Sequence, residues 1–282
     1  EGVKLTKLPS LDLYSYDSPL KAFKFKLLKE PINLYEWLSH LSGGFSEPYT
    51  FGERMAVWGK KNYNRFDVVH DNQTLAYGLI KLRNMGVPVV GTIHHPITMD
   101  KRIDIKHAET LSLKLLKWRW YSFLKMQIKV ARQLDPIIVV SENTRKDVVK
   151  DFKIDPKKTR KVLHGIDHKT FEPIPSIKRK KNQLITTASA DVPLKGLIYL
   201  IRAYSDLLND FPDLSLIVIG KLRDGPTSKE LDKKGIKDKV KFISDLTSRQ
   251  IAELYAESTI AVSPSVYEGF GFPAGEAMSC GI

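Results

Sequence analysis

Cysteine and long apolar runs are almost absent from this sequence. Cys280 is the only cysteine among 282 residues, so no disulfide can form within the chain and a reducing compartment is expected. We expect Cys280 itself to be a small buried residue rather than a reactive thiol. No apolar run approaches the roughly 20 residues of a membrane span, and no signal-peptide pattern opens the chain. We therefore expect a cytoplasmic protein, with a peripheral place on the inner face of the membrane left open.

The charge is strongly unbalanced. Lys and Arg number 45 against 32 Asp and Glu, which gives a formal net charge of +13. Such an excess favours negatively charged partners: nucleic acid, anionic lipid headgroups or phosphorylated small molecules. The basic residues are spread out and no nucleic-acid-binding motif is found, so no nucleic-acid partner is expected. A basic nucleic-acid-binding or membrane-binding protein without catalytic activity remains the non-enzymatic alternative.

Strands alternate with helices along most of the chain, which predicts an α/β fold with parallel sheets covered on both faces. In the first half we expect strands at 66–70, 87–93, 136–140 and 161–163, and helices at 74–84, 105–134 and 141–152. In the second half we expect strands at 184–187, 214–219, 240–243 and 260–263, and helices at 196–208, 226–234 and 247–257, with another from Pro273.

A segment with two prolines and a basic run, residues 172–181, interrupts this alternation. It predicts a hinge between two Rossmann-like domains. We assign residues 1–172 to an N-terminal domain, 173–182 to the linker and 183–282 to a C-terminal domain. Ligands of such sheets bind outside the carboxyl ends of the strands, so a cleft between the domains is expected. Both ends of the chain look cut, which predicts a fragment whose second domain is incomplete.

The segment from Ser263 to Glu276 has the features of a ligand-binding turn. Its glycines, Gly269 and Gly271, allow the backbone to approach a ligand closely. Pro273 suits the first turn of a helix, whose free N–H groups and positive dipole end can hold a diphosphate. The carboxylates of Glu268 and Glu276 would repel phosphate, so we expect each to face hydroxyl groups. The alternative is an ordinary strand–turn–helix corner with solvated glutamates.

Lys195 lies in Val192–Gly196, at the predicted start of a helix. A cation is unfavourable at the positive end of a helix dipole unless an anion is bound there. The phosphate of a ligand would supply that anion. A solvated surface lysine is the alternative.

Several segments, in this order and spacing, resemble the retaining glycosyltransferases of family 4, which have the GT-B fold. The segments are 87–94, 137–142, 164–167 followed by Phe171, 193–196, 218–220, and Glu268 spaced from Glu276. The resemblance implies that a sugar moves from a nucleotide-sugar donor to an acceptor hydroxyl with retention of anomeric configuration. It also implies that residues 1–172 form the acceptor-side domain and residues 183–282 the nucleotide-sugar-binding domain. The acceptor would be a sugar, a lipid-linked or a small-molecule compound. A nucleotide-sugar epimerase or hydrolase of the same fold is the closest enzymatic alternative.

The resemblance also implies roles for individual residues. The predicted catalytic residues are Glu268 near the transferred sugar, Lys195 on the diphosphate and His94 beside the donor sugar. The predicted donor-binding residues are Gly220, Gly269, Phe270, Gly271, Phe272 and Glu276, with Glu276 on the nucleotide ribose. From the sequence alone, His94 could equally be a core or strand-end histidine. No cofactor is expected. His94, His95 and Asp100 do not have a metal-ligand spacing, so a metal-independent enzyme is expected.

The sequence departs from the family pattern at three places. Ala190 stands where the family usually has an arginine on the diphosphate, and His164 stands where it usually has an asparagine. The glycine-rich loop of the family's N-terminal region is missing. These departures put phosphate binding, in particular, in question.

Residues 101–133 are basic and aromatic. Lys125, Lys129 and Arg132 recur at helical spacing, and Trp118 and Trp120 lie nearby. This pattern predicts either a helix on an anionic membrane surface or a long helix with an ordinary solvated basic face. The basic and aromatic residues of the segment 19–28 point the same way, or form an ordinary strand or helix edge.

Overall fold

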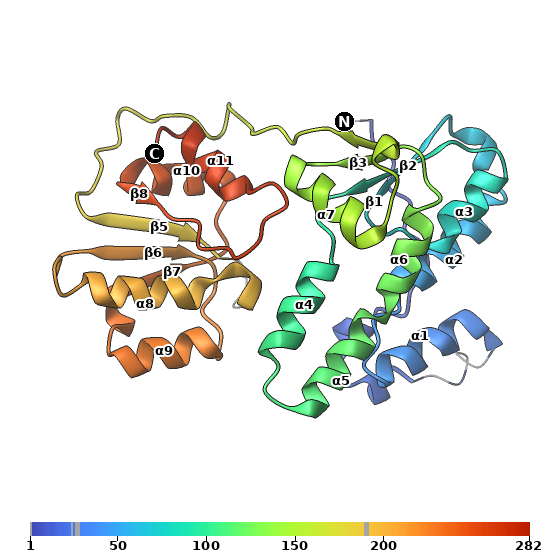
Figure 1. The fold of residues 1–282 in the computed structure, drawn as a ribbon, viewed down its shortest axis with the longest axis horizontal. Helices are drawn as coiled ribbons and strands as arrows, with labels where there is room; N and C mark the ends of the chain where they lie inside the picture. The colour runs from blue at the N-terminus through green and yellow to red at the C-terminus, as the bar shows by residue number, and fades with distance from the viewer. Residues whose placement is uncertain (1, 24, 26–28, 189–191) are drawn as a thin grey trace. The chain divides into compact units, whose positions relative to one another are not determined.

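The structure, a computed structural model, describes residues 2–23, 25, 29–188 and 192–282. It divides into two compact units, residues 1–163 and 164–282 (Figure 1). Residues 173–182 lie within the second unit in this division, and their role as a hinge stays a prediction. Ala190 lies outside the described residues, as do Lys24 and residues 26–28 of the segment 19–28.

The first unit is built on a parallel sheet with the strand order β1-β2-β3-β4. Its strands are β1 (Val69–Asn72), β2 (Val89–Ile93), β3 (Ile137–Val139) and β4 (Thr159–Lys161). Helices α3 (Tyr77–Asn84), α6 (Leu124–Ala131) and α7 (Glu142–Phe152) contribute buried side chains to the same core. Ser141 caps α7 as predicted, since its Oγ accepts a hydrogen bond from the N–H of Thr144 at 3.0 Å.

Three predictions for the first unit are wrong. The expected strand 66–70 begins three residues too early, since β1 starts at Val69 and both Phe66 and Val68 are exposed. The expected strand 161–163 lies two residues too late, because Val162 and Leu163 are 55% and 62% exposed and follow β4. The expected helix 105–134 is broken into α4 (Thr98–His107), α5 (Leu111–Trp120), a 3₁₀ turn at Tyr121–Phe123 and α6. Neither break carries glycine or proline. The first break arises because Thr110 starts a new helix by capping the N–H of Leu113.

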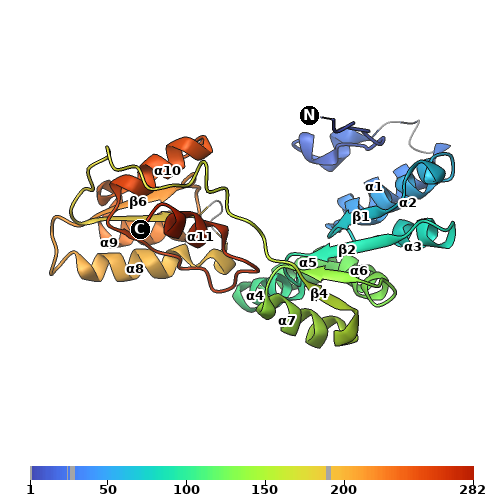
Figure 2. The same cartoon turned by 90° about the horizontal axis from the view of Figure 1, so that it is seen from above.

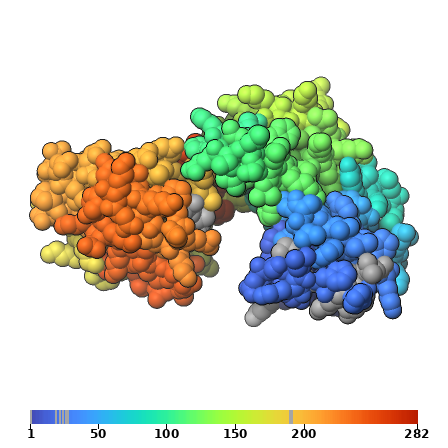
Figure 3. Space-filling model, turned by 90° about the horizontal axis from the view of Figure 1, so that it is seen from below, coloured from blue at the N-terminus to red at the C-terminus, as the bar shows by residue number. Residues whose placement is uncertain are grey.

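Two further helices, α1 (Pro31–Leu41) and α2 (Glu47–Gly59), belong to the N-terminal part of this unit, which forms the continuous blue surface of Figure 3. Helix α1 buries polar residues instead of apolar ones, namely Glu36 and Ser39. Glu36 forms an ion pair with Arg54 of α2, and Arg54 also donates to Asn33 at 2.6 Å. The ion pair with Arg54 offsets part of the desolvation cost of burying the Glu36 carboxylate.

The second unit has a parallel sheet with the order β7-β6-β5-β8. Its strands are β5 (Gln183–Thr187), β6 (Ser215–Ile219), β7 (Val240–Ile243) and the short β8 (Ile260–Ala261). The helices are α8 (Leu197–Leu207), α9 (Pro226–Lys234), α10 (Ser248–Glu257) and α11 (Phe272–Ser279). The predicted bounds of α9 and β7 are confirmed, and so is the capping box of Thr247 with Gln250.

Figure 1 shows α8 and α9 on one side of this sheet and α10 and α11 on the other, and Figure 2 shows α8 and α10 on opposite sides of the strands. Alternate residues of the central strands face these two layers. Leu184 and Leu216 pack with residues of α8 and α9, whereas Ile185 and Ile217 pack with residues of α10 and α11. Cys280 is buried and free at the end of α11. Among the described residues of both units, no helix is long and apolar enough to cross a membrane.

Candidate active site

The Lys195 turn and the loop after β8 pack directly against each other in the second unit. The 3₁₀ turn Pro193–Lys195 precedes Gly196, whose φ of 64° is in the left-handed region. The N–H of Val266 donates to the carbonyl of Leu194 at 2.9 Å. A Cβ atom added to Gly196 would lie 2.1 Å from the carbonyl oxygen of Pro264. Only glycine fits this position, which explains the Lys-Gly pair in the sequence.

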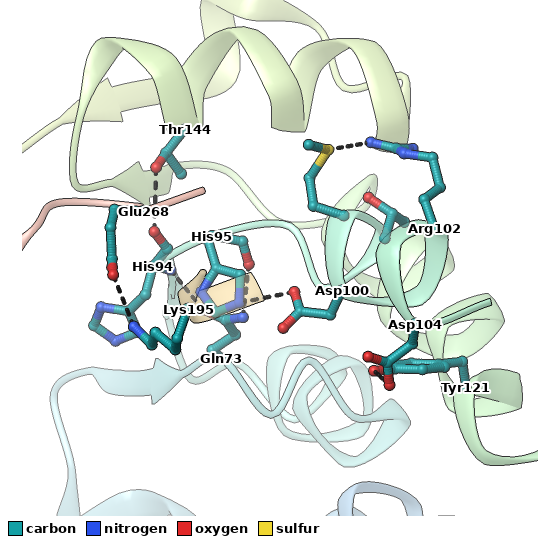
Figure 4. Close-up of polar contacts among 12 residues, drawn as sticks. Gln73, His94, His95, Asp100, Arg102, Asp104, Tyr121, Thr144, Lys195 and Glu268 are labelled. Atoms are coloured by element: carbon teal, nitrogen blue, oxygen red, sulfur yellow. Dashed lines mark hydrogen bonds and ion pairs between the residues drawn. The ribbon is translucent and has the colours of Figure 1, made fainter. Parts of the chain in front are cut away.

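Lys195 and Glu268 form an ion pair across this contact. The Nζ atom of Lys195 lies 2.8 Å from Oε1 of Glu268 (Figure 4). The hydroxyl of Ser265 donates to the same oxygen at 2.7 Å. Both charged side chains are 29% exposed, so a ligand can reach them. The anion beside Lys195 in this structure is therefore the Glu268 carboxylate. Because Glu268 balances its charge, Lys195 can lie here without a bound phosphate. Its predicted role on the diphosphate of a donor stays a prediction.

The loop then turns into α11 through Gly271. Gly271 is the N-cap of the helix with a φ of 88°, another position that favours glycine. Helix α11 begins at Phe272, one residue before the predicted start, and Pro273 lies in its first turn. The first-turn N–H groups of a helix lack intrahelical acceptors, so this end of α11 can bind an anion.

Three aromatic rings gather beside the turn. His164 stacks on Phe272 at 5.0 Å between ring centroids and meets Phe270 edge-on at 5.3 Å. Phe270 and Phe272 lie 5.2 Å apart. In addition, a Cβ atom added to Gly275 of α11 would meet the side chain of Ile166. The segment after β4 thus supports the Gly269–Phe272 loop. In the sequence, His164 opens the segment 164–167 and replaces the asparagine usual in the family, but no sequence signal predicts that it stacks on Phe272.

Glu276 is half-buried in α11, and burial raises the pKa of its carboxyl group. Tyr255 of α10 lies close by: its hydroxyl is 3.1 Å from the hydroxyl of Thr187, and burial raises its pKa to about 12. Gly220 directly follows β6, and its N–H donates to the carbonyl of Ile243 at 2.7 Å. Gly220 and Thr187 thus lie at the carboxyl ends of neighbouring strands, the edge where ligands of such sheets bind.

A cavity of about 240 Å³ opens within this unit. It is lined by the carboxyl ends of β5 and β8, by Ser265 and Glu268, and by the inner side of α11. Thr186, on β5, lines it too and is almost fully buried. Among the described residues, its hydroxyl is the only buried side-chain polar atom without a hydrogen-bond partner.

His94 lies in the first unit, immediately after β2, where neighbouring side chains fix it. Its Nε2 atom is 2.6 Å from Oδ1 of Asn72, and its backbone N–H donates to Oε1 of Gln73 at 2.5 Å. The hydroxyl of Thr144 donates to its carbonyl at 3.1 Å (Figure 4). This answers one question that the sequence left open: His94 is a strand-end residue held by polar contacts, not a core residue.

Gln73 joins the two histidines. Its Nε2 donates to the carbonyl of His95 at 2.8 Å, and Nε2 of His95 lies 3.0 Å from the Asp100 carboxylate (Figure 4). Gln73 itself has a φ of 68°, an uncommon conformation for a residue with a side chain. Buried Gln127 donates to the carbonyl of Gln73 at 3.1 Å and thereby secures this conformation. In the part of the chain that the structure describes, no group of three or more potential ligands could hold a metal ion.

Two family models cover the chain almost end to end. Residues 15–170 match "Glycosyltransferase Family 4" and residues 169–282 match "Glycosyl transferases group 1". The chain is 41% identical to MMP alpha-(1->4)-mannosyltransferase from Mycolicibacterium hassiacum over 99% of its own length and 67% of that protein. It is 26% identical to D-inositol 3-phosphate glycosyltransferase from Streptomyces scabiei, over 80% of this chain and 54% of that protein.

Solved structures have the same fold. Sucrose-phosphate synthase from Thermosynechococcus elongatus superposes with a TM-score of 0.62 at 19% identity, over 82% of this chain and 58% of that one. Anabaena HepE in complex with UDP-glucose gives a TM-score of 0.61 at 19% identity, over 80% of this chain and 61% of that one. The chain thus spans between about half and two thirds of the length of these proteins. Two parallel α/β sheets, GT-B neighbours and both family models agree: the chain belongs to glycosyltransferase family 4.

Proposed function

We propose that the protein to which this chain belongs transfers a sugar from a nucleoside-diphosphate sugar to an acceptor hydroxyl, with retention of anomeric configuration. An α-mannosyl group is the first candidate for the transferred sugar, because the relative with 41% identity is named an alpha-(1->4)-mannosyltransferase. A nucleotide-sugar donor is supported by the solved complex of HepE with UDP-glucose. The reaction takes place in the cytoplasm in this proposal, in keeping with the single cysteine.

The observation that carries the proposal is the ion pair between Lys195 and Glu268, next to the N-terminus of α11. Lys195 can change partner, since its side chain is accessible. When a donor binds, its diphosphate takes the place of Glu268 beside the ammonium group, and the first-turn amides of α11 add hydrogen bonds. The freed Glu268 carboxylate then accepts hydrogen bonds from sugar hydroxyls. Half-buried Glu276 is assigned to the ribose hydroxyls, and Gly220, Gly269 and Gly271 allow close approach of the ligand to the backbone.

The chemical step follows from these assignments. The bond between the anomeric carbon and the diphosphate oxygen breaks, and its electron pair leaves with the diphosphate. Lys195 and the α11 amides stabilise the growing negative charge. The acceptor hydroxyl attacks the same face of an oxocarbenium-like sugar, and its proton passes to the leaving diphosphate. His94 is assigned a place beside the donor sugar. Because ammonium and amide groups stabilise the diphosphate, no metal ion is required.

Product analysis on the full-length protein tests the proposal. A thermal-shift panel of nucleoside diphosphates and nucleotide sugars first identifies the donor, since a ligand that binds only the folded state raises Tm. NMR of the products, with and without acceptor, then follows the anomeric carbon. We expect an α-linked glycoside that forms only with acceptor and whose formation persists in EDTA. A free sugar or an epimerised nucleotide sugar as the main product would favour the hydrolase or epimerase alternative, and a β-linked product would exclude retention.

A further inference from the structure

Helices α4 and α5 of the first unit form a hairpin that extends away from the strands of that unit (Figure 1). No side chain of either helix is buried. Helix α5 is nevertheless rich in large apolar residues: Leu111, Leu113, Leu115, Leu116, Trp118 and Trp120. A helix that stays exposed normally has a polar outer face, so the composition of α5 is not explained by the fold alone.

The inner side of α5 packs within the unit. Leu116 lies against the turn at Gly43, where an added Cβ atom would meet its Cδ1 at 2.3 Å. Arg119 donates to the hydroxyls of Ser39 and Ser42 at 3.0 Å each. Lys117 forms an ion pair with Asp104 of α4 at 2.7 Å. These contacts fix which side of α5 faces the unit and which faces outward.

The outer side of α5 is apolar and uncovered. Leu111, Leu115 and Trp118 follow the spacing i, i+4, i+7, so they share one face of the helix. They are 73%, 62% and 56% exposed, and Lys114 lies among them at i+3. Three large apolar side chains on one exposed helical face indicate a binding surface rather than scattered surface residues.

Two lysines border this face, Lys114 of α5 and Lys101 of α4. The other two cationic residues of α5, Lys117 and Arg119, lie on its inner side, and the helix carries no carboxylate. Lys101 of α4 places its Nζ 3.8 Å from the centre of the Trp118 ring. Partial burial and, second, the positive charge of Lys125 lower the pKa of Lys101. The surface therefore combines leucine, tryptophan and lysine, the combination that suits the boundary between lipid headgroups and acyl chains.

We propose that the outer face of α5 binds the surface of an anionic lipid bilayer. Leu111, Leu115 and Trp118 enter the headgroup boundary, and Lys101 and Lys114 reach the lipid phosphates. A second copy of the chain is the less suitable partner, because a two-fold interface would bring the same cations against each other. Binding of this kind would hold the enzyme where a lipid-linked acceptor is presented. The surface residues do not include Lys195 or Glu268. An experiment on membrane binding can therefore contradict this proposal without contradicting the proposed function, and the reverse.

Vesicle co-sedimentation of the full-length protein tests this surface, with neutral phosphatidylcholine vesicles compared with vesicles containing about one third phosphatidylglycerol. We expect binding to the anionic vesicles that weakens as salt is raised. The double variant Leu115→Ser/Trp118→Ser should lose at least about tenfold in partitioning, because two apolar side chains no longer leave water. Lys114→Gln should weaken binding to anionic vesicles and leave binding to neutral vesicles unchanged.

The matched control is Phe211→Ser, which removes an exposed apolar side chain from the second unit and should bind vesicles like the wild type. Circular dichroism confirms that each variant is folded, and turnover of a water-soluble acceptor should be unchanged in all of them. The proposal is overturned if the wild type does not bind anionic vesicles, or if the double variant binds them equally well. Self-association that depends on Leu115 and Trp118, without vesicle binding, would also overturn it and identify a protein interface.

Discussion

The two units hold their candidate site residues in different ways. In the second unit, an ion pair joins Lys195 to Glu268, and both groups are partly exposed. In the first unit, His94 is held by hydrogen bonds with the side chains of Asn72, Gln73 and Thr144. An accessible ion pair can exchange one partner for a ligand at small net cost, whereas several hydrogen bonds to one residue resist rearrangement. We infer that the second unit adapts to the donor and that the first presents a preformed group.

The largest expected effect tests the backbone contact beneath the ion pair. Gly196→Val would place a branched side chain in the left-handed region and against the carbonyl oxygen of Pro264. Backbone strain of about 1–3 kcal/mol and overpacking of about 1–3 kcal/mol should together lower stability by roughly 2–6 kcal/mol. Urea unfolding monitored by circular dichroism measures the loss. Gly235→Val is the control, because Gly235 has a similar φ of 65° but open space around it; equal losses in the two variants would show that the Pro264 contact has no energetic weight.

The next effect tests the preformed group. Gln73→Ala removes the hydrogen bonds to the His94 N–H and the His95 carbonyl. If His94 acts beside the donor sugar as proposed, loss of its precise placement should lower kcat about 10- to 100-fold, with a smaller change in KM for the donor. Steady-state kinetics of the full-length enzyme measure both constants. Gln133→Ala, which removes an exposed glutamine side chain, should leave kcat unchanged. A normal kcat for Gln73→Ala would show that His94 does not depend on this contact.

A smaller effect concerns Glu276. Burial raises the pKa of this carboxyl group in the folded protein, so the folded state favours the protonated form. Its contribution to stability is therefore fully present below the unfolded-state pKa and is lost as pH rises through the folded-state pKa. Glu276→Gln should remove this loss, so the difference in Tm between variant and wild type should grow as pH rises from about 4 to about 7. A difference in Tm that does not depend on pH would contradict the raised pKa of Glu276. The variant should also bind the nucleotide more weakly, and unchanged nucleotide affinity would contradict the proposed contact between Glu276 and the ribose.

The smallest effect concerns the hydroxyl of Thr186, which is buried in the cavity without a hydrogen-bond partner among the described residues. Thr186→Val keeps the shape of the side chain and removes the unsatisfied group. It should raise the free energy of unfolding by about 1 kcal/mol. Chemical denaturation measures this change, and Thr144→Val, which removes a hydroxyl bonded to the His94 carbonyl, should do the opposite. A destabilised Thr186→Val variant would indicate that the hydroxyl has a partner after all.

Most helices and strands of the second unit could be predicted from the sequence, because the spacing of apolar residues and the helix caps agree with the observed packing. Helix α8 buries Leu197, Leu200, Ile201 and Tyr204 at helical spacing, and α10 carries its capping box. Helices α1 and α5 could not be predicted in the same way. Helix α1 turns Glu36 inward and leaves Leu38 and Leu41 exposed, and α5 buries nothing, so hydrophobic periodicity does not describe them.

The sequence could indicate which residues belong to the candidate site, but not which of them contact one another. The glycines, Lys195 and Glu268 could be found because these residue types combine with a helix start in each segment, and because the order of the segments resembles the family. That Lys195 pairs with Glu268, that His164 stacks on Phe272, and that Gln73 joins His94 to His95 depend on contacts between residues distant in sequence. The roles assigned to these residues in donor binding and catalysis stay predictions.

The central claim is that Lys195 exchanges Glu268 for the donor diphosphate, and calorimetric titration of the full-length protein with the nucleoside diphosphate tests it most directly. A lost charge-assisted contact should weaken binding about 10- to 100-fold in Lys195→Ala, with the exposed-surface variant Lys229→Ala unchanged. Glu268→Gln, which leaves Lys195 without its competing carboxylate, should bind the diphosphate at least as tightly as the wild type yet transfer no sugar. Wild-type affinity in Lys195→Ala, or weakened diphosphate binding in Glu268→Gln, would contradict the account.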